Sequence, residues 1–203
     1  MKETYAIRRR SNNGGFSLLE LMISMAIILI LAGVATMSYM PLMKQQHIVN
    51  AYNSTLTTLR RARDQAAGDM RVYVVSFTPP GTITGTQNTT TGPLLVTTVL
   101  PSDVTFHVEP GVPTSPVVAP TTPDGMGSAA FPIDFDQGVG AGGTTTIYFY
   151  PDGTAQDING NINNGVVYLG RPGDLYSSRA ITVWGSTGRI RGWRLYNPGW
   201  RQQ

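Results

Sequence analysis

One stretch decides the fold of this chain: Gly14-Gly15-Phe16-Ser17-Leu18-Leu19-Glu20, followed by the 23 uncharged residues Leu21 to Met43. About 20 apolar residues in a helix span roughly 30 Å of hydrocarbon, so the pattern predicts a membrane helix. Basic residues ahead of a first span tend to hold the N-terminus in the cytoplasm. Here these are Lys2, Arg8, Arg9 and Arg10. A carboxylate costs about 2.5–3.5 kcal/mol at the centre of a membrane helix and less near its end, so Glu20 calls for a partner.

This segment resembles the N-terminus of type IV prepilins and of the pseudopilins of type II secretion. In that family a short basic leader ends in Gly, a prepilin peptidase removes it, and the new N-terminal residue, usually Phe, is N-methylated. The resemblance implies that Gly15 ends the leader, that Phe16 becomes the methylated N-terminus, and that Glu20 pairs with the terminal amine of a neighbouring subunit. In a low-dielectric fibre core that pair attracts far more strongly than in water.

Two plainer interpretations compete with this one. An ordinary signal peptide would use Leu21 to Leu31 as its apolar region and Gly33-Val34-Ala35 as its cleavage site. Glu20 interrupts the approach to that region, however, and apolar residues continue beyond the cleavage site to Met43. A plain single-pass anchor explains the length of the span but neither Gly15-Phe16 nor Glu20. The sequence therefore favours the prepilin interpretation.

The charges are divided unevenly along the chain, although the net charge is only +3. Residues 1–15 carry four basic groups and one acid, and residues 44–71 carry five basic groups and two acids. Residues 72–170 hold seven acids and no Lys or Arg, whereas residues 171–203 hold six arginines and one acid. This division predicts two surfaces with different partners.

The periodicity after the span predicts a helix followed by a β-rich region. Ile48, Tyr52, Leu56 and Leu59 recur at intervals of four, four and three, which is one face of an amphipathic helix ending near Gly68. Branched and aromatic runs then predict strands. These are 72–77, 94–100, 104–108, 144–150, 166–169, 180–184 and 189–195. Turns are expected at Pro151-Asp152-Gly153, Asn159-Gly160 and Asn164-Gly165.

Together with the resemblance, these patterns predict an α+β, pilin-like fold. A long N-terminal helix, membrane-spanning in its first half, would pack on a C-terminal antiparallel β-domain. The expected segments are a leader (1–15), a transmembrane and fibre-core helix (16–43), an amphipathic half-helix (44–70) and a globular β-rich domain (71–203). The Pro- and Gly-rich segment 109–143 is too long for an ordinary loop.

No arrangement of residues points to catalysis. The chain has no cysteine, and its two histidines, His47 and His107, have no nucleophile pattern near them in sequence. There is no phosphate-binding glycine loop and no zinc-ligand spacing. Asp134 and Asp136 would point the same way in a strand, which leaves a weak calcium or acid/base site open beside two solvated loop acids. We therefore expect no enzyme, no cofactor and no metal.

The C-terminal arginines indicate a binding surface. A strand, a tight turn and a returning strand over 180–195 would place Arg189, Arg191 and Trp193 on one face. Gly188-Arg189-Ile190-Arg191 resembles the Gly-Arg-x-Arg motif of the FimT branch of the GspH/FimT family, which is linked to DNA uptake. The resemblance implies DNA binding through Arg189 and Arg191, with Arg194 widening the patch and Trp193 stacking on a base. Alternatively, the arginines neutralise the acidic region 72–170.

The favoured function is a minor pilin or pseudopilin, a structural subunit of a type IV pilus or a type II secretion pseudopilus. Its expected partners are other pilin subunits, the prepilin peptidase, the inner membrane and, in the FimT-like case, DNA. The β-domain would lie in the periplasm before the subunit enters the fibre. The alternative is a GspH-type pseudopilin that serves secretion and binds no DNA.

Overall fold

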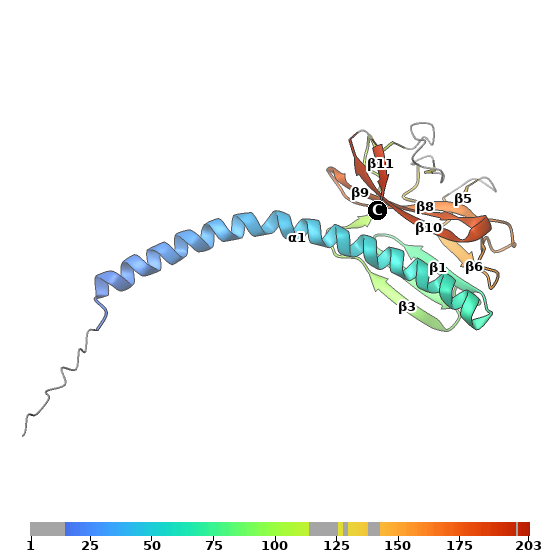
Figure 1. Cartoon of the computed structure of the whole chain (residues 1–203), viewed down its shortest axis with the longest axis horizontal. Coiled ribbons are helices and arrows are strands. Elements are labelled where there is room, and N and C mark those ends of the chain that lie inside the picture. The colour runs from blue at the N-terminus through green and yellow to red at the C-terminus, as the bar shows by residue number, and fades with distance from the viewer. Residues whose placement is uncertain (1–14, 114–125, 128–129, 138–142, 198) are drawn as a thin grey trace, which may run out of the picture. The chain divides into compact units, whose positions relative to one another are not determined.

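The computed structural model of the chain describes residues 15–113, 126–127, 130–137, 143–197 and 199–203 (Figure 1). It divides into two compact units, one ending at Leu42 and the other running from Met43 to Gln203. Helix α1 (Leu18–Asp69) belongs to both units and continues through Pro41. In the first unit the side chains of α1 are all exposed, and an 18-residue stretch of the helix has a mean hydropathy of 2.5, long and apolar enough to cross a membrane.

The second unit adds two antiparallel sheets to the rest of α1. Sheet A has the strand order β3-β2-β1-β6-β7. Its strands are β1 (Tyr73–Thr78), β2 (Thr82–Gln87), β3 (Leu94–Val99), β6 (Thr146–Phe149) and β7 (Ala155–Gln156). Sheet B has the order β11-β10-β9-β8-β4, and β5 also pairs with β8. Its strands are β4 (Thr105–Phe106), β5 (Ile133–Gln137), β8 (Asn164–Arg171), β9 (Asp174–Trp184), β10 (Arg189–Tyr196) and β11 (Gly199–Gln202).

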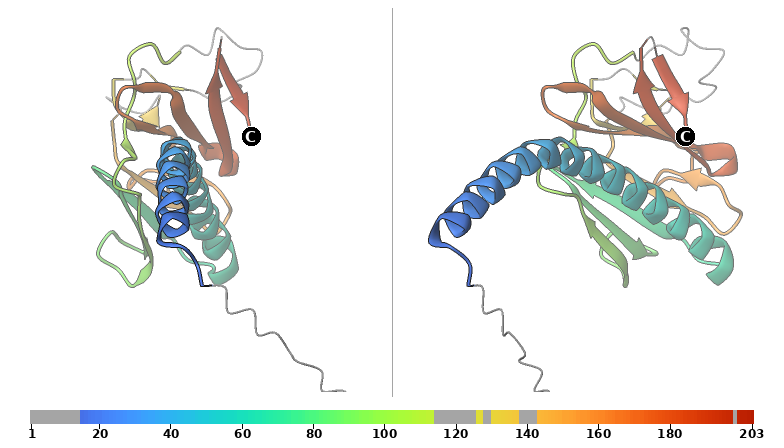
Figure 2. Two further views of the ribbon diagram at one scale, coloured as in Figure 1. Left: turned by 90° about the vertical axis from the view of Figure 1, so that its left-hand side faces the viewer. Right: turned by 60° about the vertical axis from the view of Figure 1, so that its left-hand side comes forward.

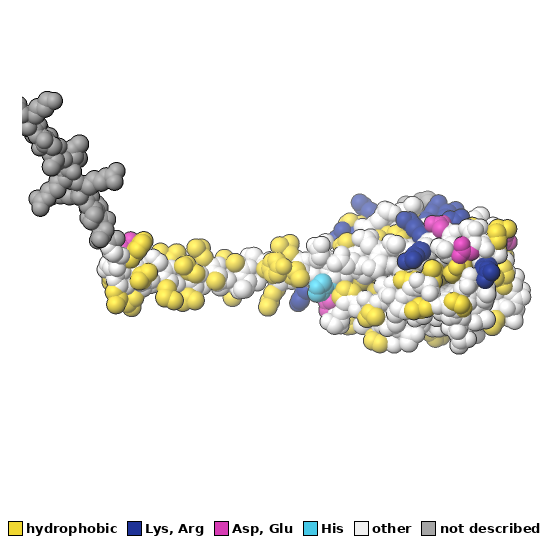
Figure 3. All heavy atoms as spheres, turned by 90° about the horizontal axis from the view of Figure 1, so that it is seen from below, with side chains coloured by type: hydrophobic (Ala, Val, Ile, Leu, Met, Phe, Trp, Pro, Cys, Tyr) yellow, Lys and Arg dark blue, Asp and Glu magenta, His cyan; other side chains and the backbone are white. Residues whose placement is uncertain are grey.

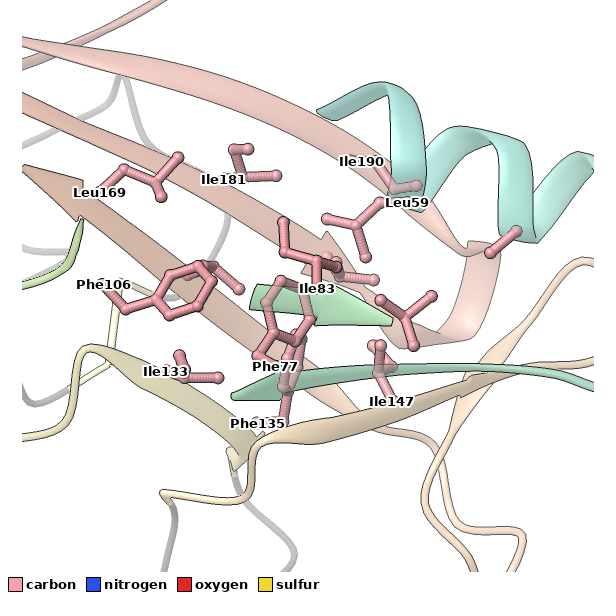
Figure 4. Packing of buried hydrophobic residues seen from close by; sticks show 14 of the residues in the cluster. Leu59, Phe77, Ile83, Phe106, Ile133, Phe135, Ile147, Leu169, Ile181 and Ile190 are labelled. Carbon is pink, nitrogen blue, oxygen red and sulfur yellow. The ribbon is translucent and has the colours of Figure 1, made fainter. Parts of the chain in front are cut away.

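The main core forms where the second half of α1 packs on both sheets (Figure 2). The buried face of the helix follows the sequence periodicity and consists of Ile48, Ala51, Tyr52, Thr55, Thr58, Leu59, Ala62 and Ala66. Leu59 faces Ile190 of β10, while Phe77 of β1 packs beside the sheet B residues of the same cluster (Figure 4). The rings of Phe77 and Phe106 meet edge to face with their centroids 5.6 Å apart.

A second cluster covers the opposite face of sheet B. Its buried members are Val112, Met126, Val166, Tyr168, Ala180, Trp193, Leu195 and Trp200. The indole N–H of Trp193 donates to the hydroxyl of Thr182 at 2.9 Å, and that of Trp200 donates to the carbonyl of Pro113 at 2.8 Å. Because both faces of sheet B are covered, the residues of β8 and β9 are buried in continuous runs instead of in alternation.

The predicted fold class is confirmed: a long N-terminal helix packs on antiparallel sheets. Each of the seven predicted strands coincides with an observed strand, and α1 ends one residue beyond Gly68. Four further strands, β2, β5, β7 and β11, were not predicted. The predicted turn at Asn164-Gly165 is wrong, because both residues begin β8 and pair with neighbouring strands. Within the segment 109–143, residues 114–125, 128–129 and 138–142 lie outside the described residues.

Candidate functional site

The three residues expected to serve processing and assembly all lie on the surface. Phe16 is 75% exposed, and Gly15 and Glu20 are also exposed. Glu20 lies in the first turn of α1, where the helix dipole favours a carboxylate. Over the described ranges, no salt bridge involves Glu20. The predicted leader ahead of Gly15, residues 1–14, lies outside the described residues.

The side chains that follow Glu20 give this half of α1 an apolar surface. Residues 15 to 46 are exposed without interruption, and their apolar side chains line the helix in Figure 3. A contiguous apolar surface of this size marks contact with a membrane or with other protein chains. Glu20 is the only charged residue between Leu18 and Met43. The segment therefore presents one carboxylate at the start of an otherwise apolar contact surface.

The second candidate site is the turn that joins β9 to β10. Residues Gly185–Thr187 form a short 3₁₀ helix, η2, which ends at Gly188 with φ at 57°, in the left-handed region that favours glycine. A Cβ atom at position 188 would lie 2.1 Å from the carbonyl oxygen of Gly153 and 3.1 Å from Arg63 Nε. The glycine of the Gly-Arg-x-Arg motif thus lets the turn pack tightly against the β6–β7 turn and against α1.

The four residues predicted to bind DNA do not form a single surface. Arg189 and Arg191 are half-buried, and Arg189 lies over the ring of Trp184 with Cζ 5.9 Å from its centroid. Trp193 is fully buried, so its predicted role as a stacking surface for a base is wrong. The physical reason is that Val112 and Met126, from outside the sheet, pack with Trp193 on this face of sheet B. Alternation along the strand predicted the correct face of the sheet for Trp193. It carried no information about whether other residues would pack on that face and bury the indole ring.

Arg194 belongs to another group of arginines, on the opposite face of β10 from Arg191, because residues three apart in a strand face opposite ways. It pairs across the strands with Arg179 of β9 and Arg201 of β11. The guanidinium groups of Arg194 and Arg201 both lie over the ring of Tyr196, at 4.8 and 5.3 Å from its centroid. Burial lowers the pKa of Arg179 to about 10, with a smaller contribution from the charge of Arg194. Arg179 Nη1 donates to the carbonyl oxygens of Ser177 and Ser178, both at 3.1 Å.

The structure instead brings Arg189 together with basic residues of α1. Arg60, Arg63, Asp64, Thr187, Arg189 and Ile190 line a cleft of about 520 Å³, called the arginine cleft below. Arg63 Nη2 donates to the carbonyl oxygen of Thr187 at 3.3 Å, which ties the helix to η2. Figure 3 shows basic side chains gathered with a few acids on one face of this unit. The sequence analysis assigned no role to Arg60 and Arg63. Their spacing of three within the basic segment 44–71 could have indicated that both lie on one side of the helix.

The residues considered for catalysis have structural partners. His47 Nδ1 lies 2.8 Å from a carboxylate oxygen of Asp103, and His107 Nε2 lies 3.1 Å from one of Glu109. Asp134 is buried and accepts the backbone N–H of Gly143 at 2.9 Å, whereas the side chain of Asp136 lies outside the described part of the chain. Over the described residues, no group of three or more His, Cys, Asp or Glu side chains is placed to hold a metal ion.

Comparison with known proteins connects the N-terminal segment to a family. The prokaryotic N-terminal methylation motif matches residues 10–36. No curated protein matches the chain. Among solved structures, the type IV minor pilin FimU of Pseudomonas aeruginosa is similar, with 11% identity, a TM-score of 0.48 and coverage of 79% of this chain and 96% of that one. The minor pseudopilin EpsH of the Vibrio cholerae type 2 secretion system has 12% identity, a TM-score of 0.44 and coverage of 72% and 94%.

The matched motif includes Gly15, Phe16 and Glu20 and ends within the exposed apolar half of α1. The same helix then packs on an antiparallel β-domain, the architecture expected from the resemblance to prepilins. The chain therefore carries a prokaryotic N-terminal methylation motif at the start of a long helix whose second half packs on an antiparallel β-domain, which is a pilin-like fold.

Proposed function

We propose that this chain is a minor pilin or pseudopilin, a structural subunit that α1 anchors in the inner membrane before assembly. The methylation motif over residues 10–36 carries the proposal, because it leads directly into an exposed apolar helix with one carboxylate. In this proposal the leader is residues 1–15, the fibre-core helix 16–43 and the amphipathic half 44–70. The globular domain, 71–203, lies in the periplasm until the subunit enters the fibre.

The processing step is tested by the mass of the mature chain. Prepilin peptidase would cleave after Gly15, and the mature protein would begin with N-methylated Phe16. Intact mass spectrometry of the membrane-extracted protein measures both changes, and Gly15→Val should leave the full-length chain uncut. A mature N-terminus at Thr36, where an ordinary signal peptide would be cut, contradicts the proposal.

Glu20 is proposed to set the register between neighbouring subunits. Its carboxylate would pair with the N-terminal amine of the adjacent chain, in a fibre core where each charge is otherwise surrounded by apolar side chains. Its exposure and its lack of a salt bridge within the described residues support a role outside the fold of the single subunit.

A finer proposal is that the subunit binds DNA during uptake, weakly and without sequence preference. Arg189 and Arg191 are two residues apart in β10, a rise of about 7 Å, which is roughly the spacing of successive phosphates along one DNA strand. Fluorescence anisotropy of a labelled oligonucleotide with the full chain in detergent tests this proposal. The double variant Arg189→Gln/Arg191→Gln should bind more weakly, and equal binding by both proteins would remove the role of these arginines.

The alternative is a GspH-type pseudopilin that serves protein secretion and does not bind DNA. The uneven charge distribution favours it, because the six arginines of 171–203 would neutralise the seven acids of 72–170 in the same or a neighbouring subunit. Deleting the gene distinguishes the two functions. Loss of secretion supports the alternative, whereas loss of transformation or of pilus assembly supports the uptake pilin.

A further inference from the structure

We infer that the arginine cleft is a binding site for a phosphate group of a nucleic-acid backbone, held jointly by α1 and the β9–β10 turn. Arg60 and Arg63 would bind it from the helix, and Arg189 from the start of β10. The inference rests on the DNA binding proposed above. It places the principal contact with DNA at the junction between α1 and the β9–β10 hairpin, and not along the face of β10 that carries Arg189 and Arg191.

The charges that line the cleft favour an anion. Arg60, Arg63 and Arg189 contribute three positive groups, and Asp64 contributes one negative group. Arg60 and Arg63 are three residues apart, so both side chains leave the same side of α1. Guanidinium groups donate hydrogen bonds in a planar fork that matches the non-bridging oxygens of a phosphodiester group bidentately. The cleft therefore suits an anion with two charged oxygens, and the DNA binding proposed above identifies that anion as a phosphodiester group.

The structure holds Arg63 in place before any ligand arrives. Its Nη2 atom donates to the carbonyl of Thr187, and its Nε atom is buried without a hydrogen-bond partner among the described residues. The absence of a side chain at Gly188 allows this close approach, since a Cβ would lie 3.1 Å from Arg63 Nε. A guanidinium already fixed by packing loses less conformational entropy when it binds a ligand. Gly188 would thus contribute to phosphate binding indirectly, because it leaves room for Arg63 of α1 beside the β9–β10 turn.

The neighbouring Arg61 supplies a matched control. Arg60 and Arg61 are both exposed residues of the same helix turn, but Arg61 lines a different groove, which it shares with Val96 and Thr98 of β3. Replacing either arginine with Gln removes one positive charge from nearly the same place in the sequence. Only Arg60→Gln removes a group from the arginine cleft. Any difference between the two variants therefore reports on position and not on net charge.

The experiment measures anisotropy of a fluorescein-labelled DNA duplex with the full chain in detergent, at several salt concentrations. Each phosphate contact contributes about 0.9 to the slope of log K against log salt for duplex DNA. Because the three arginines would share one phosphate group, Arg60→Gln and Arg63→Gln should each weaken binding and reduce the slope by no more than that amount, while Arg61→Gln should leave both the affinity and the slope nearly unchanged. Asp64→Asn should tighten binding at every salt concentration, because it removes the only carboxylate among the described residues that line the cleft.

Each outcome either supports or overturns the inference. Equal effects of Arg60→Gln and Arg61→Gln would show that the arginine cleft is not the phosphate site. The broader proposal that the protein binds DNA would still stand. A wild-type protein that does not bind DNA would refute both the cleft and the DNA-binding proposal. Since Arg63→Gln also removes the hydrogen bond to Thr187, the fold of this variant is checked by tryptophan fluorescence, and Arg63→Lys must restore part of the lost affinity. If Asp64→Asn weakens binding, the cleft does not hold an anion.

Discussion

Replacing Gly192 with Ala should destabilise the β-domain, although the substitution adds only one methyl group. Gly192 faces α1 from β10, and an added Cβ would lie 1.6 Å from Tyr52 Oη and 2.5 Å from Cζ. Ordinary contact begins at 3.4 Å, so the two groups must separate by about 1.8 Å. Tyr52 is 5% exposed and packed between helix and sheets, which leaves its ring little room to move. Overpacking of this kind costs about 1–3 kcal/mol, and we expect a value near the upper end.

Intrinsic fluorescence measures this effect, because Trp184, Trp193 and Trp200 all belong to the β-domain. A loss of about 2–3 kcal/mol lowers the Tm of a domain of this size by roughly 4–12 °C. Gly199→Ala is the matched control: it lies in β11 and has no atom within 4 Å of the added Cβ, so its Tm should hardly change.

The clash itself is tested by a double-mutant cycle with Tyr52→Ala. That substitution removes the ring that the new methyl group at position 192 would meet. The added methyl should therefore cost much less in the Tyr52→Ala background than in the wild type. Additive losses in the cycle, or a wild-type Tm for Gly192→Ala, would refute the close packing of Tyr52 against β10 as the cause.

Three further outcomes are expected. Glu20→Ala should be inserted and cleaved normally but be depleted from sheared fibres on immunoblots, and normal incorporation would remove the proposed register contact. Leu59→Ala should lower the free energy of unfolding by about 2–5 kcal/mol, since Leu59 is fully buried between helix and sheets; urea titration measures it. Hydrogen bonds from Asn161 and from nearby backbone N–H groups hold the pKa of Asp157 below its ordinary 3.8. Its contribution to stability is therefore present at neutral pH and lost as the pH falls below about 4 through the lowered pKa, which NMR titration of Asp157 checks.

The helix and the longer strands could be predicted because their side chains follow a periodic pattern. The apolar face from Ile48 to Ala66 repeats at helical spacing, and β1, β8 and β10 are rich in branched or aromatic residues. Strand β2, by contrast, has Ile83 as its only large apolar residue, and β7 spans only Ala155–Gln156. Such segments become strands because a neighbouring strand offers hydrogen bonds, which no local pattern records.

The candidate site residues likewise fall into those that the sequence could predict and those that only the structure reveals. Gly15, Phe16 and Glu20 lie within six consecutive residues, and their proposed roles depend on order along the chain, so the sequence was sufficient to select them. The arginine cleft depends on which helix residues meet the β9–β10 turn, more than a hundred residues away. The burial of Trp193 likewise depends on Val112 and Met126, which are distant in the sequence and pack in the same cluster. Contacts of this length leave no periodic pattern, and only the structure reveals them.

The position of sheet B in the chain has a consequence for how the protein matures. Strands β8 to β11 come from residues 164–203, yet Val167, Ile181 and Ile190 in them complete the core around α1. Before the ribosome has made these four strands, the amphipathic half of α1 has only sheet A and the short strands β4 and β5 to cover it. The nascent chain must therefore keep an incompletely covered apolar helix from aggregating until β8 to β11 have been made. A premature stop codon just before β10 would leave that helix face permanently open, and such a product should be found in inclusion bodies or degraded.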